Sequence, residues 1–148
     1  MSTLVVGTVK NKSGSGAPTI QNSSGVEIGQ FAGGWTTFSG GHDDSFGDRG
    51  SFNVSSITDN GTGDYTVNWQ NDFSTAGGYA VVASCCADGS VNGSTTCIQI
   101  HTNSHLQTVY GNAMITDPTA GASRVVVYHP TNRARQDVDY ISVVAFGV

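Results

Sequence analysis

Residues 51–69, SFNVSSITDNGTGDYTVNW, form the stretch that decides the expected fold. Apolar and polar residues alternate in its first half, through Phe52 and Val54, and again in its second half, residues 65–69. A period of two places successive side chains on opposite faces of a pleated strand. Between the halves, residues 59–64 (DNGTGD) supply Asp, Asn and Gly, which suit tight turns. The stretch therefore predicts a β-hairpin.

The composition extends this expectation to the whole chain. Only 11% of the 148 residues are charged, against roughly 25% in typical domains. The chain has a single glutamate, Glu27, and two lysines. The charged residues that usually build exposed helix faces are therefore scarce. Gly, Ser, Thr, Asn and β-branched Val and Ile take their place. We expect one all-β domain with a real core.

Candidate strands from residue 35 onward recur about every ten residues, separated by turn clusters. This spacing favours an antiparallel β-sandwich of jelly-roll type over βαβ units. We expect this domain at residues 35–148. The candidate strands are residues 35–38, 51–57, 65–69, 79–86, 95–101, 106–110, 113–115, 123–128 and 138–146.

An extended N-terminal arm is expected at residues 1–34, because this segment has too little apolar surface to fold as an independent unit. Its last apolar stretch ends at Gly33-Gly34, and Trp35 is expected to anchor the arm there. The arm must lie on its own domain or on a neighbouring subunit, for docking or subunit exchange. The docking residues expected in it are Leu4, Val5 and Val6.

Two expected strands, residues 79–83 (YAVVA) and 141–146 (ISVVAF), carry apolar bulk at nearly every position. Continuous apolar strands are buried on both faces, whereas a small sandwich buries only its inner face. The surplus face favours contact with another subunit. The alternative is a monomer in which residues 1–34 cover it.

The charge pattern excludes several partners. The formal net charge is −5, and nucleic-acid binding needs clustered positive charge. The only local basic pair is Arg133-Ala-Arg135, which we expect in a solvated turn. No apolar run approaches the ~20 residues of a membrane span, and Leu4-Val5-Val6 is too short for a signal-peptide core. We expect a soluble protein made in a cytoplasm.

The three cysteines, Cys85, Cys86 and Cys97, form an odd set. Adjacent cysteines on a strand point to opposite faces, so at most one of the pair can meet Cys97. Reduced thiols that pack as small core residues are the favoured interpretation, and a late disulfide is the alternative. Zinc is not expected, because the chain has no second cysteine pair at metal spacing.

Enzyme and metal signatures are missing from the sequence. It has no G-x-S-x-G elbow, Walker loop or G-x-G-x-x-G motif. His101 and His105 lack the helix and the Glu of a metalloprotease. Residues 42–48 (HDDSFGD) lack the terminal Glu of a calcium loop, so a solvated turn is favoured there. We expect no enzyme and no catalytic, cofactor or metal residue.

Aromatic residues and loops give the remaining site candidates. Trp69 alternates in step with Tyr65, which favours a core position. Flat faces such as those of Trp35 and Tyr140 are also what sugar-binding sites use. Because binding residues gather on loops, we expect receptor contacts in two polar loops. The candidate residues there are Asp88, Asn92, His129, Asn132 and Arg133.

Three stretches of the chain resemble short virion structural proteins and tail-fibre-like proteins of marine bacteriophages. They are residues 1–29 (MSTLVVGTVKNKSGSGAPTIQNSSGVEIG), residues 51–69 and residues 137–147 (DVDYISVVAFG). The resemblance implies a non-enzymatic virion protein that decorates the particle as a capsid decoration or head-fibre protein, or as a short tail-fibre-like knob.

It further implies a homotrimer, other capsid or tail proteins as partners, and a virion location after synthesis in the host bacterial cytoplasm. The alternative function is a lectin-like receptor-binding module that recognises host surface glycans. A depolymerase fragment ranks last, because the scattered carboxylates give no pair for glycoside cleavage.

Overall fold

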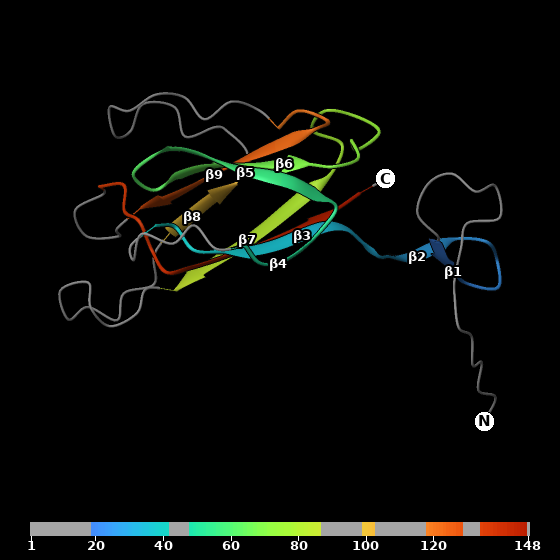
Figure 1. Cartoon of the computed structure of the whole chain (residues 1–148). Coiled ribbons are helices and arrows are strands. Elements are labelled where there is room, and N and C mark those ends of the chain that lie inside the picture. Colours follow the sequence, from blue (N-terminus) through green and yellow to red (C-terminus); the bar gives the residue numbers. More distant parts are fainter. Residues whose placement is uncertain (1–18, 42–47, 87–98, 103–117, 129–133, 148) are drawn as a thin grey trace.

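The computed structural model describes residues 19–41, 48–86, 99–102, 118–128 and 134–147. These residues contain ten β-strands and no helix. The strands form three antiparallel sheets: a two-stranded sheet near the N-terminus and two four-stranded sheets (Figure 1). The prediction of an all-β, antiparallel protein is confirmed.

The two four-stranded sheets form the body of the protein. Sheet I has the strand order β4-β3-β10-β7, and sheet II has the order β5-β6-β9-β8. The strand bounds are β1 (Thr19–Gln21), β2 (Glu27–Gln30), β3 (Ala32–Phe38), β4 (Asp48–Phe52), β5 (Val54–Gly61), β6 (Asp64–Trp69), β7 (Ala80–Cys86), β8 (Gln99–Thr102), β9 (Ala122–Tyr128) and β10 (Tyr140–Phe146).

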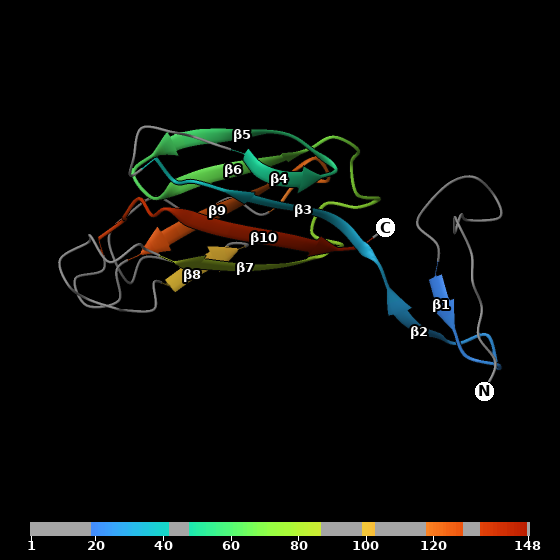
Figure 2. The same cartoon turned by 60° about the horizontal axis from the view of Figure 1, so that its bottom comes forward.

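The two sheets lie against each other in a sandwich-like arrangement, with the core between them (Figure 2). Strict alternation along β10 turns every second residue inward. Trp69 lies in this core as predicted, and its indole N–H lies 3.3 Å from both the Tyr79 hydroxyl and the Ser123 hydroxyl. The core residues are Phe38, Tyr65, Val67, Trp69, Phe73, Tyr79, Val125, Val127, Val138, Ile141, Val143 and Ala145.

The hairpin predicted from residues 51–69 is present as β5 and β6, which pair antiparallel across a turn at Thr62-Gly63. Gly63 has φ +63°, which L side chains rarely adopt. A Cβ at this position would lie 2.6 Å from the backbone nitrogen of Gln136. The turn therefore needs glycine both for its backbone conformation and for the close approach of a later segment.

The single strand predicted at residues 51–57 is wrong, because the chain breaks at Asn53. Strand β4 ends before Asn53 in sheet I, and β5 begins after it in sheet II. Asn53 has φ +58°, a conformation that asparagine tolerates better than most residues. Its side chain donates to the carbonyls of Gly33 (2.8 Å) and Asn71 (3.2 Å). Asn53 is thus the crossing point between the two sheets.

Gly33 and Gly34, where the last apolar stretch of the arm is expected to end, are strand residues. They lie within β3, where Gly34 pairs with Ala145 of β10. A Cβ on Gly34 would lie 2.8 Å from the Trp69 ring, so glycine here lets the core aromatic approach the strand. Trp35 is accordingly a strand residue on the exposed face of sheet I. The division of the chain at residue 34 stays a prediction.

The N-terminal hairpin, made of β1 and β2, lies beyond the end of the body in both views (Figures 1 and 2). Only Phe31 separates β2 from β3. Within the described ranges, the extensive packing of β1 and β2 is on each other.

Candidate functional site

The outer face of sheet I carries a continuous apolar row. Phe52 of β4 pairs with Trp35 of β3, Trp35 pairs with Val144 of β10, and Val144 pairs with Val82 of β7. Because directly paired residues share a face of the sheet, these four side chains cross all four strands. We call Phe52, Trp35, Val144 and Val82 the apolar row.

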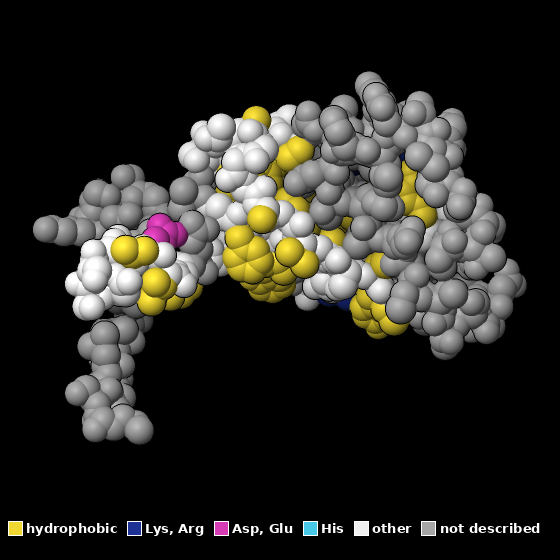
Figure 3. Space-filling model, turned by 180° about the vertical axis from the view of Figure 1, so that it is seen from behind, with side chains coloured by type: hydrophobic (Ala, Val, Ile, Leu, Met, Phe, Trp, Pro, Cys, Tyr) yellow, Lys and Arg dark blue, Asp and Glu magenta, His cyan; other side chains and the backbone are white. Residues whose placement is uncertain are grey.

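This row is open to solvent in the chain as described. Trp35 is 40%, Phe52 55% and Val82 60% exposed, and Val144 is half-buried. Phe146 adds a further exposed ring near the end of β10. Figure 3 shows hydrophobic side chains gathered on this part of the body and, separately, on the N-terminal hairpin. Contiguous exposed apolar surface of this kind marks an interaction site.

A small residue shapes the surface around Trp35. A Cβ added to Gly50 of β4 would lie 3.3 Å from the Trp35 ring, so the indole lies close over a strand position without a side chain. Gly50 also pairs with Thr37, the next outward residue of β3. The large ring therefore lies against the sheet instead of standing on a bulky neighbour.

A polar row runs beside the apolar one. Thr37 pairs with Ser142, and Ser142 pairs with Ser84. The hydroxyl oxygens of Thr37 and Ser142 are 3.0 Å apart and share a hydrogen bond. These hydroxyls lie along one side of the apolar row and form its boundary. Water-free contact with a partner is therefore limited to the apolar row.

Beyond the polar row, a charged group is held over an aromatic ring. The guanidinium carbon of Arg49 lies 4.1 Å from the centroid of the Tyr140 ring. Such a cation–π contact contributes about 0.5–1 kcal/mol at an exposed site. Arg and aromatic residues are also the types that dominate binding energy at protein interfaces. Sheet I therefore presents apolar, polar and cationic parts on one face.

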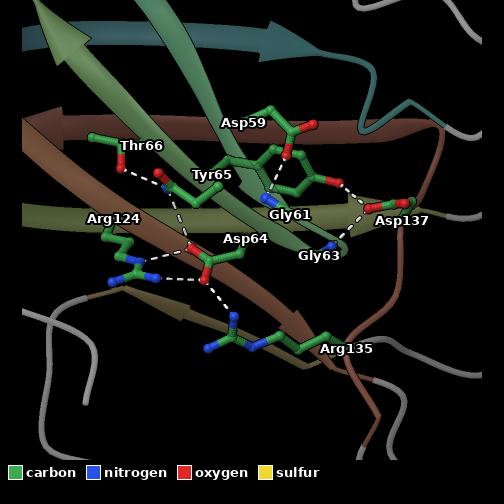
Figure 4. Close-up of polar contacts among 10 residues, drawn as sticks. Asp59, Gly61, Gly63, Asp64, Tyr65, Thr66, Arg124, Arg135 and Asp137 are labelled. Carbon is green, nitrogen blue, oxygen red and sulfur yellow. Dashed lines mark hydrogen bonds and ion pairs between the residues drawn. The ribbon is translucent and has the colours of Figure 1, made fainter. Parts of the chain in front are cut away.

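A second cluster of functional groups lies at the turn between β5 and β6 (Figure 4). Asp64 is fully buried, and its carboxylate accepts two hydrogen bonds from Arg124, at 2.7 and 2.5 Å. Arg135 donates to the same carboxylate at 2.5 Å. The hydrogen bond to Asp64 raises the pKa of Arg124, which keeps this guanidinium charged. A buried carboxylate is stable only with such paired donors.

Arg135 corrects one expectation. It is not part of a solvated turn, because its guanidinium is mostly buried against Asp64. Arg135 and Asp64 lie 71 residues apart in the chain, so no local sequence pattern predicts this ion pair.

The neighbouring Tyr65 completes this cluster. Its hydroxyl lies 2.7 Å from the Gly40 carbonyl oxygen and 2.7 Å from the Asp137 carboxylate. The same Asp137 oxygen accepts the backbone N–H of Gly63 at 2.6 Å. Burial, followed by the contact with Asp137, raises the pKa of Tyr65 well above its usual value. Tyr65 stays neutral, and its contact with Asp137 connects the β5–β6 hairpin to the segment before β10.

The charges of this cluster are engaged with one another, which indicates a structural role. Both described arginines near the turn are paired with Asp64, and Tyr65 lies between backbone and carboxylate acceptors. Within the described ranges, no group of three or more His, Cys, Asp or Glu side chains is placed to hold a metal ion. The outer face of sheet I is therefore the better candidate for contact with a partner.

The loop and arm residues expected at the site lie outside the described residues. They are Asp88, Asn92, His129, Asn132 and Arg133 in the loops, and Leu4, Val5 and Val6 in the arm. Cys97 and residues 42–47 also lie outside them, as do two expected strands, residues 106–110 and 113–115.

The described cysteines separate as their adjacency predicts. Cys85 is half-buried and packs against the core, whereas Cys86 is exposed. The interpretation as a small core residue is confirmed for Cys85 and wrong for Cys86. Alternation along an edge strand explains the difference, because successive side chains point to opposite faces.

Sequence reasoning found half of the apolar row. The apolar runs of β7 and β10 indicated a surplus face, which the structure places at Val82 and Val144. The aromatic half does not follow from these runs, because Phe52 is expected in one strand with Val54 and Trp35 is expected as the anchor of the arm. The signal that separates Phe52 from Val54 is Asn53, a residue that accepts positive φ in the middle of an alternating run.

No helix long and apolar enough to cross a membrane occurs in the described part of the chain. Comparison of the chain with protein-family models, with curated proteins and with solved structures gives no significant match.

Proposed function

We propose that this chain is a non-enzymatic structural protein of a bacteriophage particle. In this role it decorates the particle surface, as a capsid decoration or head-fibre protein or as a short tail-fibre-like knob. The observation that carries the proposal is the apolar row on sheet I, which is exposed in the single chain. The phage-like stretches at residues 1–29, 51–69 and 137–147 supply the class of particle.

Self-association follows from the same surface. A row of two aromatic and two aliphatic side chains across a whole sheet costs free energy in water, at roughly 25 cal/mol per Å² of apolar area. A homo-oligomer removes that surface from water in every copy. The resemblance favours three copies, and the remaining partners are other capsid or tail proteins.

The strand order supports a sandwich built from strands that are distant in the chain. β10 lies between β3 and β7 in sheet I, and β9 lies between β6 and β8 in sheet II. Neighbours so far apart in the chain occur in Greek-key sandwiches in general, and the jelly-roll type remains part of the proposal. The position of the N-terminal hairpin beyond the body supports an arm.

A lectin-like module for host surface glycans is the second candidate. It is favoured by the same face, where the Trp35 and Phe52 rings lie near the Thr37 hydroxyl and the Arg49–Tyr140 pair. Sugars stack on aromatic faces and accept hydrogen bonds from such donors. On this interpretation the sugar site is a sheet face and not the loops expected from the sequence.

Particle localisation tests the first candidate. Antibodies raised against the purified protein should label purified particles at the capsid or the tail, and density for the body should appear there. Presence of the chain in infected cells together with its absence from purified particles would contradict the proposal.

A glycan array with the purified oligomer tests the second candidate. We expect a Trp35→Ser variant to lose any signal that a Gln70→Ser control retains, because Gln70 is exposed outside sheet I. No signal from the native protein at high valency would exclude the lectin function.

A further inference from the structure

The N-terminal hairpin is a second exposed apolar surface. Its aliphatic side chains Ile20, Val26 and Ile28 are between 45% and 64% exposed, and Phe31, which directly follows β2, is 47% exposed. Two strands alone form no core, and an isolated two-stranded hairpin is marginally stable in water. The hairpin therefore needs a surface on which to pack.

The hairpin is nevertheless well formed locally. The Asn22 side chain accepts the backbone N–H groups of Ser24 (3.0 Å) and Val26 (2.9 Å), and Gly25 takes φ +78° in the turn. The Asn22 backbone N–H donates to the Val26 carbonyl at 2.9 Å. A preformed turn lowers the entropy lost when the hairpin docks.

The apolar row of the same copy is out of reach. Phe31 is the only residue between β2 and β3, and β3 is paired with β10 from Ala32 onward. In the structure this short connection holds the hairpin away from the outer face of sheet I (Figures 1 and 2). The hairpin extends past the end of the body instead (Figure 1).

We propose that the N-terminal hairpin of one copy docks on the apolar row of a second copy. This inference rests on the self-association included in the proposed function, and it names the contact. Val82 and Trp35 would receive the aliphatic side chains of the hairpin, among which Ile28 is the most exposed. In the single chain the apolar area of both surfaces is exposed to water. Docking removes this area from water on both copies.

The charges of the two surfaces are complementary. Glu27 is the only glutamate of the chain, and it is exposed on β2. Of the three arginines in the described ranges, two pair with Asp64 and only Arg49 lies on sheet I. Opposite charges on the rims of two apolar surfaces guide orientation more than they add affinity.

The contact is heterologous, because a hairpin meets a sheet. Each copy donates one hairpin and accepts another. Successive copies therefore close into a ring or continue as a filament. Stable interfaces bury about 800 Å² on each partner. Donating and accepting at once doubles the number of contacts that hold each copy.

A mixing experiment tests the exchange directly. The Ile28→Asp variant keeps an intact apolar row and loses its hairpin surface, whereas Val82→Asp keeps its hairpin and loses the row. A charge placed at a desolvated contact should raise the dissociation constant at least about tenfold in each variant alone. Sedimentation of the 1:1 mixture should then recover a heterodimer, since one intact hairpin still meets one intact row.

Both substituted residues are more than half exposed in the single chain, so folding should be unaffected. Circular dichroism and the Tm of each variant check this, and Gln70→Ser serves as the matched exposed control. A second pair tests the charges: Glu27→Arg should weaken association, and Arg49→Glu in the same chain should restore most of it.

Three outcomes would overturn the exchange. They are full association of the folded Ile28→Asp variant, no heterodimer in the mixture, and a native protein that is monomeric at every concentration. If Val82→Asp dissociates while Ile28→Asp does not, sheet I packs on sheet I of the second copy instead. Particle localisation is independent of these results, so failure of the exchange and failure of the virion role are distinguishable.

Discussion

Trp35 and Phe52 lie directly opposite each other on neighbouring strands of sheet I, with both rings exposed on the outer face. Aromatic pairs across strands normally contribute to a sheet by packing against each other. Here the pair also extends a row that reaches Val82 at the far edge. The relationship places the largest exposed side chains of the body on one surface.

The first prediction concerns self-association through this surface. Replacing Trp35 with Ser should weaken association about tenfold or more, because truncating a large aromatic at an interface commonly costs 2 kcal/mol. Sedimentation velocity across a concentration series measures the effect. Gln70→Ser, at an exposed turn, should leave the dissociation constant unchanged. Equal association of the Trp35→Ser and native proteins would remove sheet I from the interface.

The second prediction concerns the crossing between the sheets. Asn53→Ala should lower the free energy of unfolding by about 3 kcal/mol, because it strains a positive φ and leaves the Gly33 and Asn71 groups without their partner. Asn53→Gly should cost about 1 kcal/mol less, since glycine accepts this φ but makes no side-chain bond. Urea unfolding distinguishes the two. Identical losses would show that the backbone conformation contributes nothing.

The third prediction concerns the buried ion-pair cluster. Asp64→Asn should lower the free energy of unfolding by about 2–3 kcal/mol, because Arg124 and Arg135 lose their counter-charge while largely buried. The two guanidinium groups retain some contact with water, which keeps the loss below that of a fully buried pair. Asp59→Asn, at an exposed position of β5 near the same turn, should change stability by less than about 0.5 kcal/mol. Equal effects at the two positions would contradict a structural role for the cluster.

The fourth prediction follows from the raised pKa of Tyr65. In the unfolded chain a tyrosine loses its proton near pH 10, whereas the folded protein holds the Tyr65 proton to higher pH. Above about pH 10 the unfolded state therefore binds fewer protons than the folded state, and stability falls as pH rises. Below that pH the contribution is constant.

Tyr65→Phe provides the comparison. At neutral pH it should cost about 1–2 kcal/mol through loss of the contacts to Gly40 and Asp137. The difference between the native and Tyr65→Phe proteins should shrink as the pH rises past 10 in urea unfolding series. A difference that stays constant into strong alkali would show that Tyr65 titrates normally.

Local alternation predicted much of the body. The β5–β6 hairpin and the core position of Trp69 follow from residues close together in the chain. Each depends on a period of two or on turn chemistry, which act over a few residues. The apolar runs of β7 and β10 also indicated an outer apolar face.

Features set by distant residues could not be predicted in this way. The break at Asn53 preserves the alternation of Phe52 and Val54, so the period gives no sign of it. The local sequence predicts a solvated turn at Arg135, whereas the fold places its side chain against Asp64. Gly34 is expected at the end of an apolar stretch of the arm, yet in the strand it leaves room for the Trp69 ring. In each case the deciding neighbour lies on another strand.

The central claim is that association covers the outer face of sheet I, and Trp35 can report this in the native protein. The chain has two tryptophans, and Trp69 is buried in the core, so acrylamide quenching of fluorescence reports chiefly on Trp35. We would follow quenching and sedimentation together across a dilution series. We predict that Trp35 becomes protected and its emission shifts to the blue as the oligomer forms. Oligomers in which Trp35 stays as accessible as in the single chain would contradict the account.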